Sequence, residues 1–205
     1  GIVDTGLMGH LENEKYLIAV SISTTFLTII FWSFGFLRMG TVGLISQTLG
    51  KGDYRELVNI VFRNIFIALI LAFLIIIFKP VLLNIIYQIF SVSSQTNIFI
   101  DDYISIRIFS APAELIIYVL VGFFLGIQRT IISSLLIINL SVLNIILSFY
   151  FVNELNMNVK GVALGSLLAS YLTVIFFSVF LYYFIIKKFK VIPRLAYNKL
   201  LNIKK

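Results

Sequence analysis

Two carboxyl groups stand in apolar surroundings where they could bind a proton or a cation. Asp4 lies in GIVDTGLMGHL, residues 1–11, and Glu114 follows SAPA in a stretch without any other charge. An ionised carboxylate is costly in hydrocarbon, so a carboxylate kept there indicates a functional site. Because Pro112 removes one backbone hydrogen bond, we expect a kinked helix with a free carbonyl near Glu114.

Each carboxylate also has a simpler interpretation. Glu114 could carry a proton, or it could sit in a partly hydrated position near the outward end of its helix. Asp4 could serve in coupling, or its DTG sequence could cap a helix near the membrane interface.

Hydroxyl and amide side chains recur at helical spacing in three apolar stretches, and each set falls on one helical face. The sets are Ser21, Thr25 and Thr28; Ser134, Ser141, Asn144 and Ser148; and Ser166, Ser170 and Thr173. Three helices with one polar face each would enclose a polar pathway for a solute. The alternative is that serine and threonine bond their own backbone or join neighbouring helices.

Small residues at four-residue spacing predict close helix packing. They are Gly122 with Gly126, and Gly161 with Gly165 and Ala169.

Other kinds of chemistry find little support in the sequence. The chain has no cysteine and one histidine, His10, so we expect no metal site and no cofactor. GKGD is too short for a phosphate-binding loop, and neither a catalytic triad nor a paired-carboxylate motif can be assembled, so we do not expect an enzyme. The net charge of +7 follows membrane topology instead of forming a basic face, which excludes a nucleic-acid partner.

The elements that position these residues are membrane helices. Of the 205 residues, 60% are hydrophobic and only 12% are charged, with a mean hydropathy of +1.05. A helix needs about 20 apolar residues to cross the bilayer. Five stretches are predicted to cross it: 16–37, 64–78, 108–128, 130–153 and 161–186.

Three segments are not predicted as complete crossings. Residues 1–9 are interpreted as the end of an earlier, truncated helix. Residues 80–100 begin with a proline and contain SVSSQTN, which predicts an interfacial turn and a short helix that does not cross. Residues 187–205 carry seven positive charges and form either a cytoplasmic linker or a helix on anionic lipid. The predicted division is therefore a transmembrane lobe over 1–186 and a basic segment over 187–205.

Basic residues orient the crossings, because cytoplasmic loops carry the excess of lysine and arginine. One side receives twelve of the sixteen: Arg38, Lys51, Arg55, Arg63, Arg129 and the seven of 187–205. The other side receives Lys15, Lys79, Arg107 and Lys160. We therefore expect the GKGDYRE loop in the cytoplasm. His10, Asp101, Asp102 and Glu154 would face outward.

Four stretches, in the right order and over nearly the whole chain, resemble the multidrug and toxic compound extrusion (MATE) transporters. The resemblance is closest to their DNA-damage-inducible F-like branch. The stretches are VDTGLMGHL, GFLRMGTVGLISQTLGKGD, SAPAELIIYVLVGFFLGIQ and LNIILSFYFVNELNMNVKGVALGS. The resemblance implies an all-α membrane protein comprising one six-helix lobe with its first helix truncated. A second six-helix lobe is then expected in the full-length chain.

The resemblance also implies roles for particular residues. The coupling carboxylate of the family's first helix matches Asp4, and the asparagine of its N-x-x-x-D pattern matches Asn144. Ser148 stands where that pattern has aspartate, and Ser166 matches a polar residue near the start of the sixth helix. With one carboxylate fewer, proton coupling through Asp4 is favoured over a sodium site, although neutral oxygens with one carboxylate can still hold Na⁺. Ser141, Ser170 and Thr25 are expected to line the substrate cavity.

The expected function is export of organic, cationic drugs or toxic compounds in exchange for H⁺ or Na⁺, by alternating access in the plasma membrane. One alternative is a flippase of lipid-linked precursors, which would have several cationic residues in its cavity. Another is a half-transporter fragment that does not transport.

Overall fold

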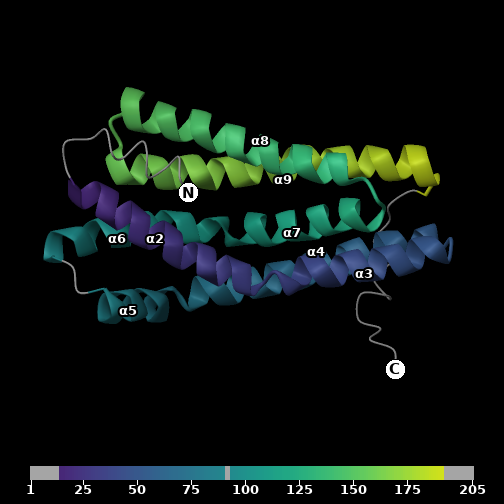
Figure 1. Cartoon of the computed structure of the whole chain (residues 1–205), viewed down its shortest axis with the longest axis horizontal. Helices are drawn as coiled ribbons and strands as arrows, with labels where there is room; N and C mark the ends of the chain where they lie inside the picture. The colour runs from purple at the N-terminus through teal and green to yellow at the C-terminus, as the bar shows by residue number, and fades with distance from the viewer. Residues whose placement is uncertain (1–13, 91–92, 192–205) are drawn as a thin grey trace.

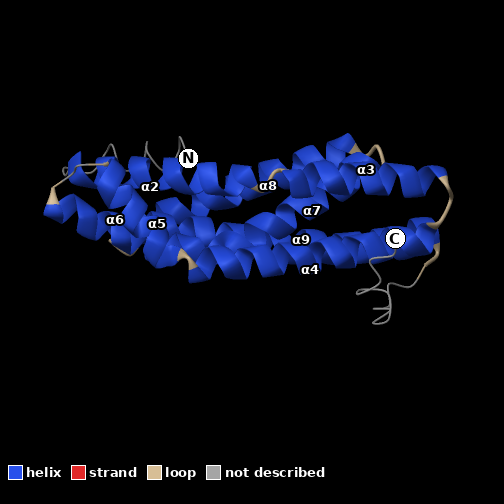
Figure 2. Cartoon of the chain, turned by 90° about the horizontal axis from the view of Figure 1, so that it is seen from below, coloured by secondary structure: helices blue, strands red, loops and turns tan. Residues whose placement is uncertain are grey.

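The computed structural model describes residues 14–90 and 93–191, and every regular element within these ranges is a helix (Figure 2). In chain order the elements are α2 (Glu14–Ser33), α3 (Phe36–Gly50), α4 (Tyr54–Ile77), α5 (Lys79–Ile89), α6 (Ser94–Arg107), a 3₁₀ turn (Ile108–Ser110), α7 (Ala111–Gly126), α8 (Thr130–Phe149), a π-helical turn (Tyr150–Glu154) and α9 (Asn158–Phe189). Asp4 and His10 lie outside the described residues.

The prediction of five membrane crossings is confirmed. Among the described residues, five helical stretches are long and apolar enough to span a bilayer: Glu14–Gly50, Tyr54–Ile77, Ser94–Gly126, Thr130–Glu154 and Asn158–Phe189. The last two agree closely with the predicted 130–153 and 161–186. Because α9 continues to Phe189, the division predicted at 186 and 187 falls within a helix, and residues 192–205 lie outside the described ranges.

The first crossing is longer than predicted. The expected end at Leu37 is wrong, because α3 follows α2 after a short turn at Phe34–Gly35 and continues to Gly50. Arg38, which is partly buried, therefore lies within a 37-residue helical stretch and does not end the helix. Its expected cytoplasmic side stays a prediction.

The third crossing also begins earlier than predicted, at Ser94 and not at Ile108. Arg107 and Glu114 therefore lie within one continuous 33-residue helical stretch, and their expected positions near the outward end stay a prediction. The short helix expected after Pro80 is present as α5, which has 11 residues and carries the proline in its first turn. A proline is tolerated there because the first N–H groups of a helix have no intrahelical partner.

The helices lie side by side along the long axis of the molecule, with α8 and α9 along one edge and α3 and α4 along the other (Figure 1). The helix α7 packs against α3, α4, α8 and α9, and the α6–α7 crossing is the most buried of the five. Apolar side chains on the outer surface, such as Trp32 and Ile131, are exposed in numbers that a soluble domain rarely shows. In a membrane protein these side chains face lipid.

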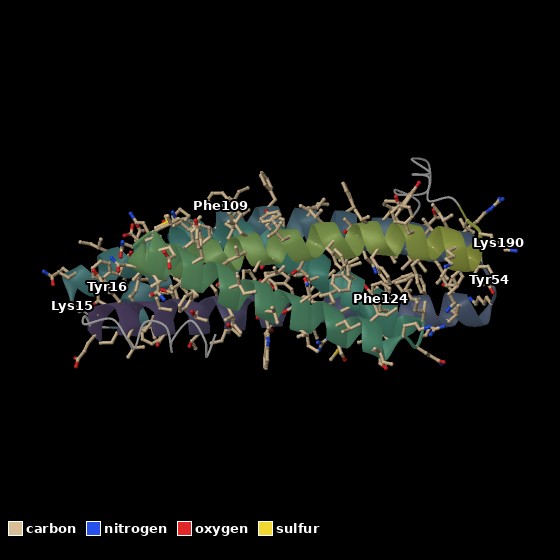
Figure 3. All side chains as sticks on the ribbon, turned by 90° about the horizontal axis from the view of Figure 1, so that it is seen from above. Lys15, Tyr16, Tyr54, Phe109, Phe124 and Lys190 are labelled. Carbon is tan, nitrogen blue, oxygen red and sulfur yellow. The ribbon has the colours of Figure 1, made fainter. Side chains whose placement is uncertain are left out.

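The two ends of the molecule differ in charge. Lys15 lies at one end, while Tyr54 and Lys190 lie at the other (Figure 3). The rings of Tyr54 and Phe189 stack with centroids 4.9 Å apart, so the start of α4 and the end of α9 meet there. This end carries Lys51 and Arg55 of the GKGDYRE stretch, together with Lys187 and Lys188 of the last turn of α9. It is the end predicted to be cytoplasmic, and it is called the inner end below; the opposite end is the outer end.

Two apolar cores divide the lobe along its length. The outer core joins α2, α5, α6 and the beginnings of α7 and α9, and includes Ile100, Ile104 and Leu115. The inner core joins α3, the start of α4 and the ends of α7 and α9, and includes Phe123 and Phe124. The polar residues singled out in the sequence lie mainly beside the outer core.

Candidate transport site

A cavity of about 320 Å³ opens between α2, α6, α7, α8 and α9. Its apolar lining comprises Leu27, Phe31, Leu140 and Ile145. Its polar lining comprises Thr24, Thr28, Tyr103, Arg107, Glu114, Ser141, Asn144, Ser166 and Ser170. A cavity of this size with a few converging polar groups is typical of a small-molecule site.

An ion pair is the centre of the polar lining. Arg107 Nη2 donates to Glu114 Oε1 at 2.8 Å, and the two side chains are only 16% and 13% exposed. The pair bridges the place where α6 gives way to the 3₁₀ turn before Pro112. The helix interruption expected from that proline is therefore present, and a salt bridge spans it.

Further contacts hold the guanidinium of Arg107 in place. It donates to Ser110 Oγ, and its centre lies 5.7 Å from the centroid of the Phe31 ring. A cation over an aromatic face is attracted by the ring quadrupole. Because Phe31 belongs to α2, this side chain joins the first and third crossings.

The hydroxyl of Ser170 connects α9 to the ion pair. Its Oγ lies 2.8 Å from Glu114 Oε1 and 3.0 Å from the backbone oxygen of Ser166. A hydroxyl has one proton and can donate to only one of these acceptors at a time. A carboxylate is a stronger acceptor than a backbone carbonyl, so the bond to Glu114 is favoured.

A second hydrogen bond joins α8 to α9 at the cavity. Asn144 Nδ2 donates to Ser166 Oγ at 2.6 Å. Both residues are predicted from the sequence to take part in ion coupling, and the structure brings them into direct contact. One turn of α9 thus connects Asn144 through Ser166 and Ser170 to Glu114.

The predicted residues do not all reach the cavity. Ser141 and Ser170 line it, whereas Thr25 does not: its side chain is exposed on α2, and Thr24 and Thr28 take the lining positions. Thr24 Oγ1 also donates to Tyr103 Oη at 3.1 Å.

Ser148 lies apart from the cavity, in the contact between α8 and α9. It is fully buried, and its Oγ has no hydrogen-bond partner among the described residues. A Cβ placed on Gly165 would lie 2.4 Å from this oxygen, so the helices approach here as closely as the small-residue spacing predicted.

The sequence did not single out Arg107, Tyr103, Phe31 or Thr24, which all contribute to the site. Arg107 precedes Glu114 by seven residues, which is two helical turns. A search for a cation at helical spacing from the buried carboxylate would have found it. Within the described residues, no three His, Cys, Asp or Glu side chains gather as a metal site would require.

A sequence model of the MatE family matches residues 1–150, which is most of the chain. This chain belongs to the MatE family. The resemblance noted in the sequence is thereby confirmed, and with five span-length helices the chain is a multi-pass protein of the inner membrane.

Two relatives indicate the branch. The chain is 33% identical to DNA damage-inducible protein F of Escherichia coli K12 over 175 residues, which is 85% of this chain and 38% of that protein. It is 26% identical to multidrug export protein MepA of Staphylococcus haemolyticus over 180 residues, which is 88% of this chain and 40% of that protein. The chain thus spans about two fifths of the length of these relatives.

Solved structures share the fold. An outward-facing multidrug resistance MATE family transporter of the MOP superfamily superposes with a TM-score of 0.80 at 22% identity, over 96% of this chain and 43% of that one. A MATE crystal structure in complex with MaD5 gives a TM-score of 0.81 at 21% identity, over 95% of this chain and 44% of that one. The described residues therefore have the architecture of one lobe of a MATE transporter.

Proposed function

We propose that the chain forms one lobe of a secondary antiporter that exports small organic compounds by alternating access. The observation that carries this proposal is the polar cavity with its buried ion pair, enclosed by span-length helices in a member of the MatE family. Relatives that are named multidrug export proteins support export as the direction of transport. A transporter needs such an internal binding site, whereas a scaffold does not.

The proposed coupling ion is H⁺, carried by Asp4. Ionising a carboxylate near the bilayer centre costs about 2.5–3.5 kcal/mol on insertion scales, so protonation of Asp4 can bias the conformation of its helix. Asn144 and Ser166 are proposed to contribute neutral oxygen and amide groups beside it. The same oxygens with one carboxylate also suit Na⁺, which is the second candidate.

Alternating access requires a second lobe, and the relatives are more than twice as long as this chain. We propose that the second lobe closes the cavity from the opposite side. Rocking of the two lobes would then expose the cavity first to one side of the membrane and then to the other.

A flippase of lipid-linked precursors is the main alternative. Such a protein is expected to present several cationic residues to an anionic headgroup. The described cavity lining carries one, Arg107, and Glu114 already neutralises it. The cavity therefore favours small organic solutes.

The test uses the full-length protein in liposomes with an imposed pH gradient. Two dyes serve as probes, ethidium as a cation and rhodamine B as a zwitterion. We expect the gradient to drive export of at least one dye, and Asp4→Asn to abolish that export because the exchangeable proton is lost. Asp101→Asn, an exposed carboxylate at the outer end, serves as the matched control.

Unchanged export by the Asp4→Asn protein would overturn the assignment of coupling to Asp4. Export driven by a sodium gradient and not by a pH gradient would replace H⁺ by Na⁺. Flux of a lipid-linked glycan, without flux of either dye, would favour the flippase.

A further inference from the structure

One face of α9 near the inner end combines aromatic rings with two lysines. The residues repeat at intervals of three and four, so they form one stripe along the helix, called the inner stripe below. They line a cavity of about 360 Å³ and are Phe180, Tyr183, Phe184, Lys187 and Lys188. None of these residues lines the candidate transport site, so the inner stripe is a separate feature of the lobe.

The inner stripe crosses the level at which the membrane surface is expected. The stretch 161–186 contains no charged residue, and Lys187 is the first charge after it. Tyr182 and Tyr183 precede this lysine by five and four residues, and tyrosine is enriched at membrane interfaces. Because a helix rises 1.5 Å per residue, Phe180 lies about 10 Å deeper along the axis than Lys187. The rings are therefore at the depth of acyl chains, and the lysines are at the depth of headgroups.

The aromatic part of the inner stripe is held from behind by the inner core. The ring of Phe124 is fully buried, and its centroid lies 5.9 Å from the ring centroids of both Phe180 and Phe184. Phe180 is 39% exposed and Tyr183 is 66% exposed, so both keep an outward surface. Rings that are already fixed lose little conformational entropy when a ligand packs on them.

The two lysine ammonium groups are available to an anion. Within the described residues, neither takes part in an ion pair or a hydrogen bond. Lys188 Nζ lies 5.4 Å from the ring centroids of both Phe184 and Phe189, and this contact holds the charge beside the rings. The negative end of the helix dipole opposes an anion here, but it amounts to about half a charge against two full positive charges.

The carboxylates at this end are engaged elsewhere. The start of α4 packs against the end of α9 and brings two of them close to it. Asp53 Oδ1 accepts a hydrogen bond from the backbone N–H of Glu56 at 3.0 Å, and Glu56 Oε1 pairs with Arg63 at 3.3 Å. Neither carboxylate forms an ion pair with a lysine of the inner stripe, whose positive charge is therefore not compensated by them.

We propose that the inner stripe binds one anionic phospholipid of the leaflet at the inner end. Lys187 and Lys188 hold its phosphate, and one acyl chain lies along Tyr183, Phe184 and Phe180. Each lysine near an anionic headgroup contributes roughly a fivefold gain in binding. A zwitterionic phospholipid fits the same rings, but its positive group opposes the lysines. This inference does not depend on the proposed transport function.

The basic segment that follows α9 is a less suitable occupant. Residues 192–205 contain four positive and no negative charges, so they would bring like charges to the two lysines. An anionic phospholipid supplies the opposite charge and an apolar chain in one molecule. The membrane around a span-length helix provides such lipids at high local concentration.

Lipid binding is measured on the purified full-length protein in detergent by native mass spectrometry. The probes are phosphatidylglycerol and phosphatidylcholine with the same two acyl chains. We expect the parent to bind phosphatidylglycerol roughly tenfold more tightly than phosphatidylcholine, because only the first is anionic. Soluble sn-glycerol 3-phosphate carries the phosphate without acyl chains, and we expect that it does not displace the lipid.

Two double variants locate the preference. Lys187→Gln with Lys188→Gln removes two positive charges from the inner stripe, and we expect the preference for phosphatidylglycerol to fall to about twofold or less. Lys51→Gln with Arg55→Gln removes two positive charges at the same end but outside the stripe, and this matched control should keep the preference. Tyr183→Ala should weaken both lipids alike, because it removes ring surface and no charge. Size-exclusion profiles that match the parent show that each variant is folded.

Equal binding of the two lipids by the parent would overturn the proposal. An equal loss of preference in both double variants would also overturn it, since a diffuse positive surface and not the inner stripe would then attract the lipid. Displacement by sn-glycerol 3-phosphate would overturn it in favour of a soluble phosphate ligand. All of these outcomes are independent of dye export by Asp4→Asn, which tests the transport mechanism.

Discussion

The outer and inner halves of the lobe share α7 and α9 but are held together differently. In the outer half, Arg107, Glu114 and Ser170 link α6, α7 and α9 at the cavity, and Asn144 links α8 to Ser166 of α9. In the inner half, α7 contacts α3 and α9 through glycine and phenylalanine, with Phe124 and Phe184 rings 5.9 Å apart. Dry, close packing resists rearrangement, whereas hydrogen bonds around a cavity can exchange partners. The cavity of the outer half can therefore rearrange its hydrogen bonds while the helix packing of the inner half stays the same.

Removal of Arg107 is expected to have the largest effect on stability, because it leaves Glu114 buried without its cation. The loss of one partner of a buried pair costs about 3–5 kcal/mol, and partial hydration of the cavity places this site at the lower end. Arg107→Leu should therefore strongly lower the melting temperature of the full-length protein in detergent. The double variant Arg107→Leu with Glu114→Gln should recover part of the lost melting temperature. If it does not, the unpaired carboxylate of Glu114 is not the cause of the loss.

A methyl group at Gly126 should be the most damaging small change in the inner half. A Cβ there would lie 2.7 Å from Ile45 Cβ, and overpacking of this kind costs roughly 1–3 kcal/mol. Gly126→Ala should therefore lower the melting temperature, while Gly43→Ala, which meets nothing within 4 Å, serves as the matched control. If both variants melt alike, the contact between α3 and α7 is not as tight as described.

The buried polar link of the inner half should matter less. Asn64 Nδ2 donates to Thr41 Oγ1 at 2.8 Å, between α4 and α3. Hydrogen bonds between membrane helices average about 0.6 kcal/mol in double-mutant cycles. A cycle of Asn64→Ala and Thr41→Val should give a coupling energy of about that size. A coupling several times larger would show that the inner half also depends on polar contacts.

Ser148→Ala should have the smallest effect on stability. Its hydroxyl is buried without a partner among the described residues, so its removal should change the free energy of unfolding by less than about 0.5 kcal/mol. Transport should persist, since Ser148 is not part of the cavity lining. A folded Ser148→Ala protein that no longer exports dye would instead return this residue to the coupling site.

The number and nature of the crossings could be predicted from the sequence because apolar length is a direct requirement of the bilayer. Their ends could not, because each charge was interpreted as an interface. The helices continue past Arg38 and Arg107, and for Arg107 the reason is visible in its salt bridge to Glu114. An ion pair between two side chains compensates a charge inside the protein. Hydropathy is computed residue by residue, so it does not detect such a pair.

The candidate site was predicted in part. Asn144 and Ser166 do meet, and Ser141 and Ser170 do line the cavity. Thr25 does not, because adjacent helical positions differ by about 100° in direction and the spacing of hydroxyls alone could not fix the rotation of α2. The role of Asp4 stays a prediction, since this residue lies outside the described ranges.

The single proton of Ser170 decides whether two helices are tied together at the cavity. The hydroxyl can donate to Glu114 Oε1 on α7, 2.8 Å away, or to the backbone oxygen of Ser166 on its own helix, 3.0 Å away. In the first orientation it forms a bond between α7 and α9, and in the second it forms none. Rotation about one C–O bond therefore makes or releases an interhelical contact without moving either backbone.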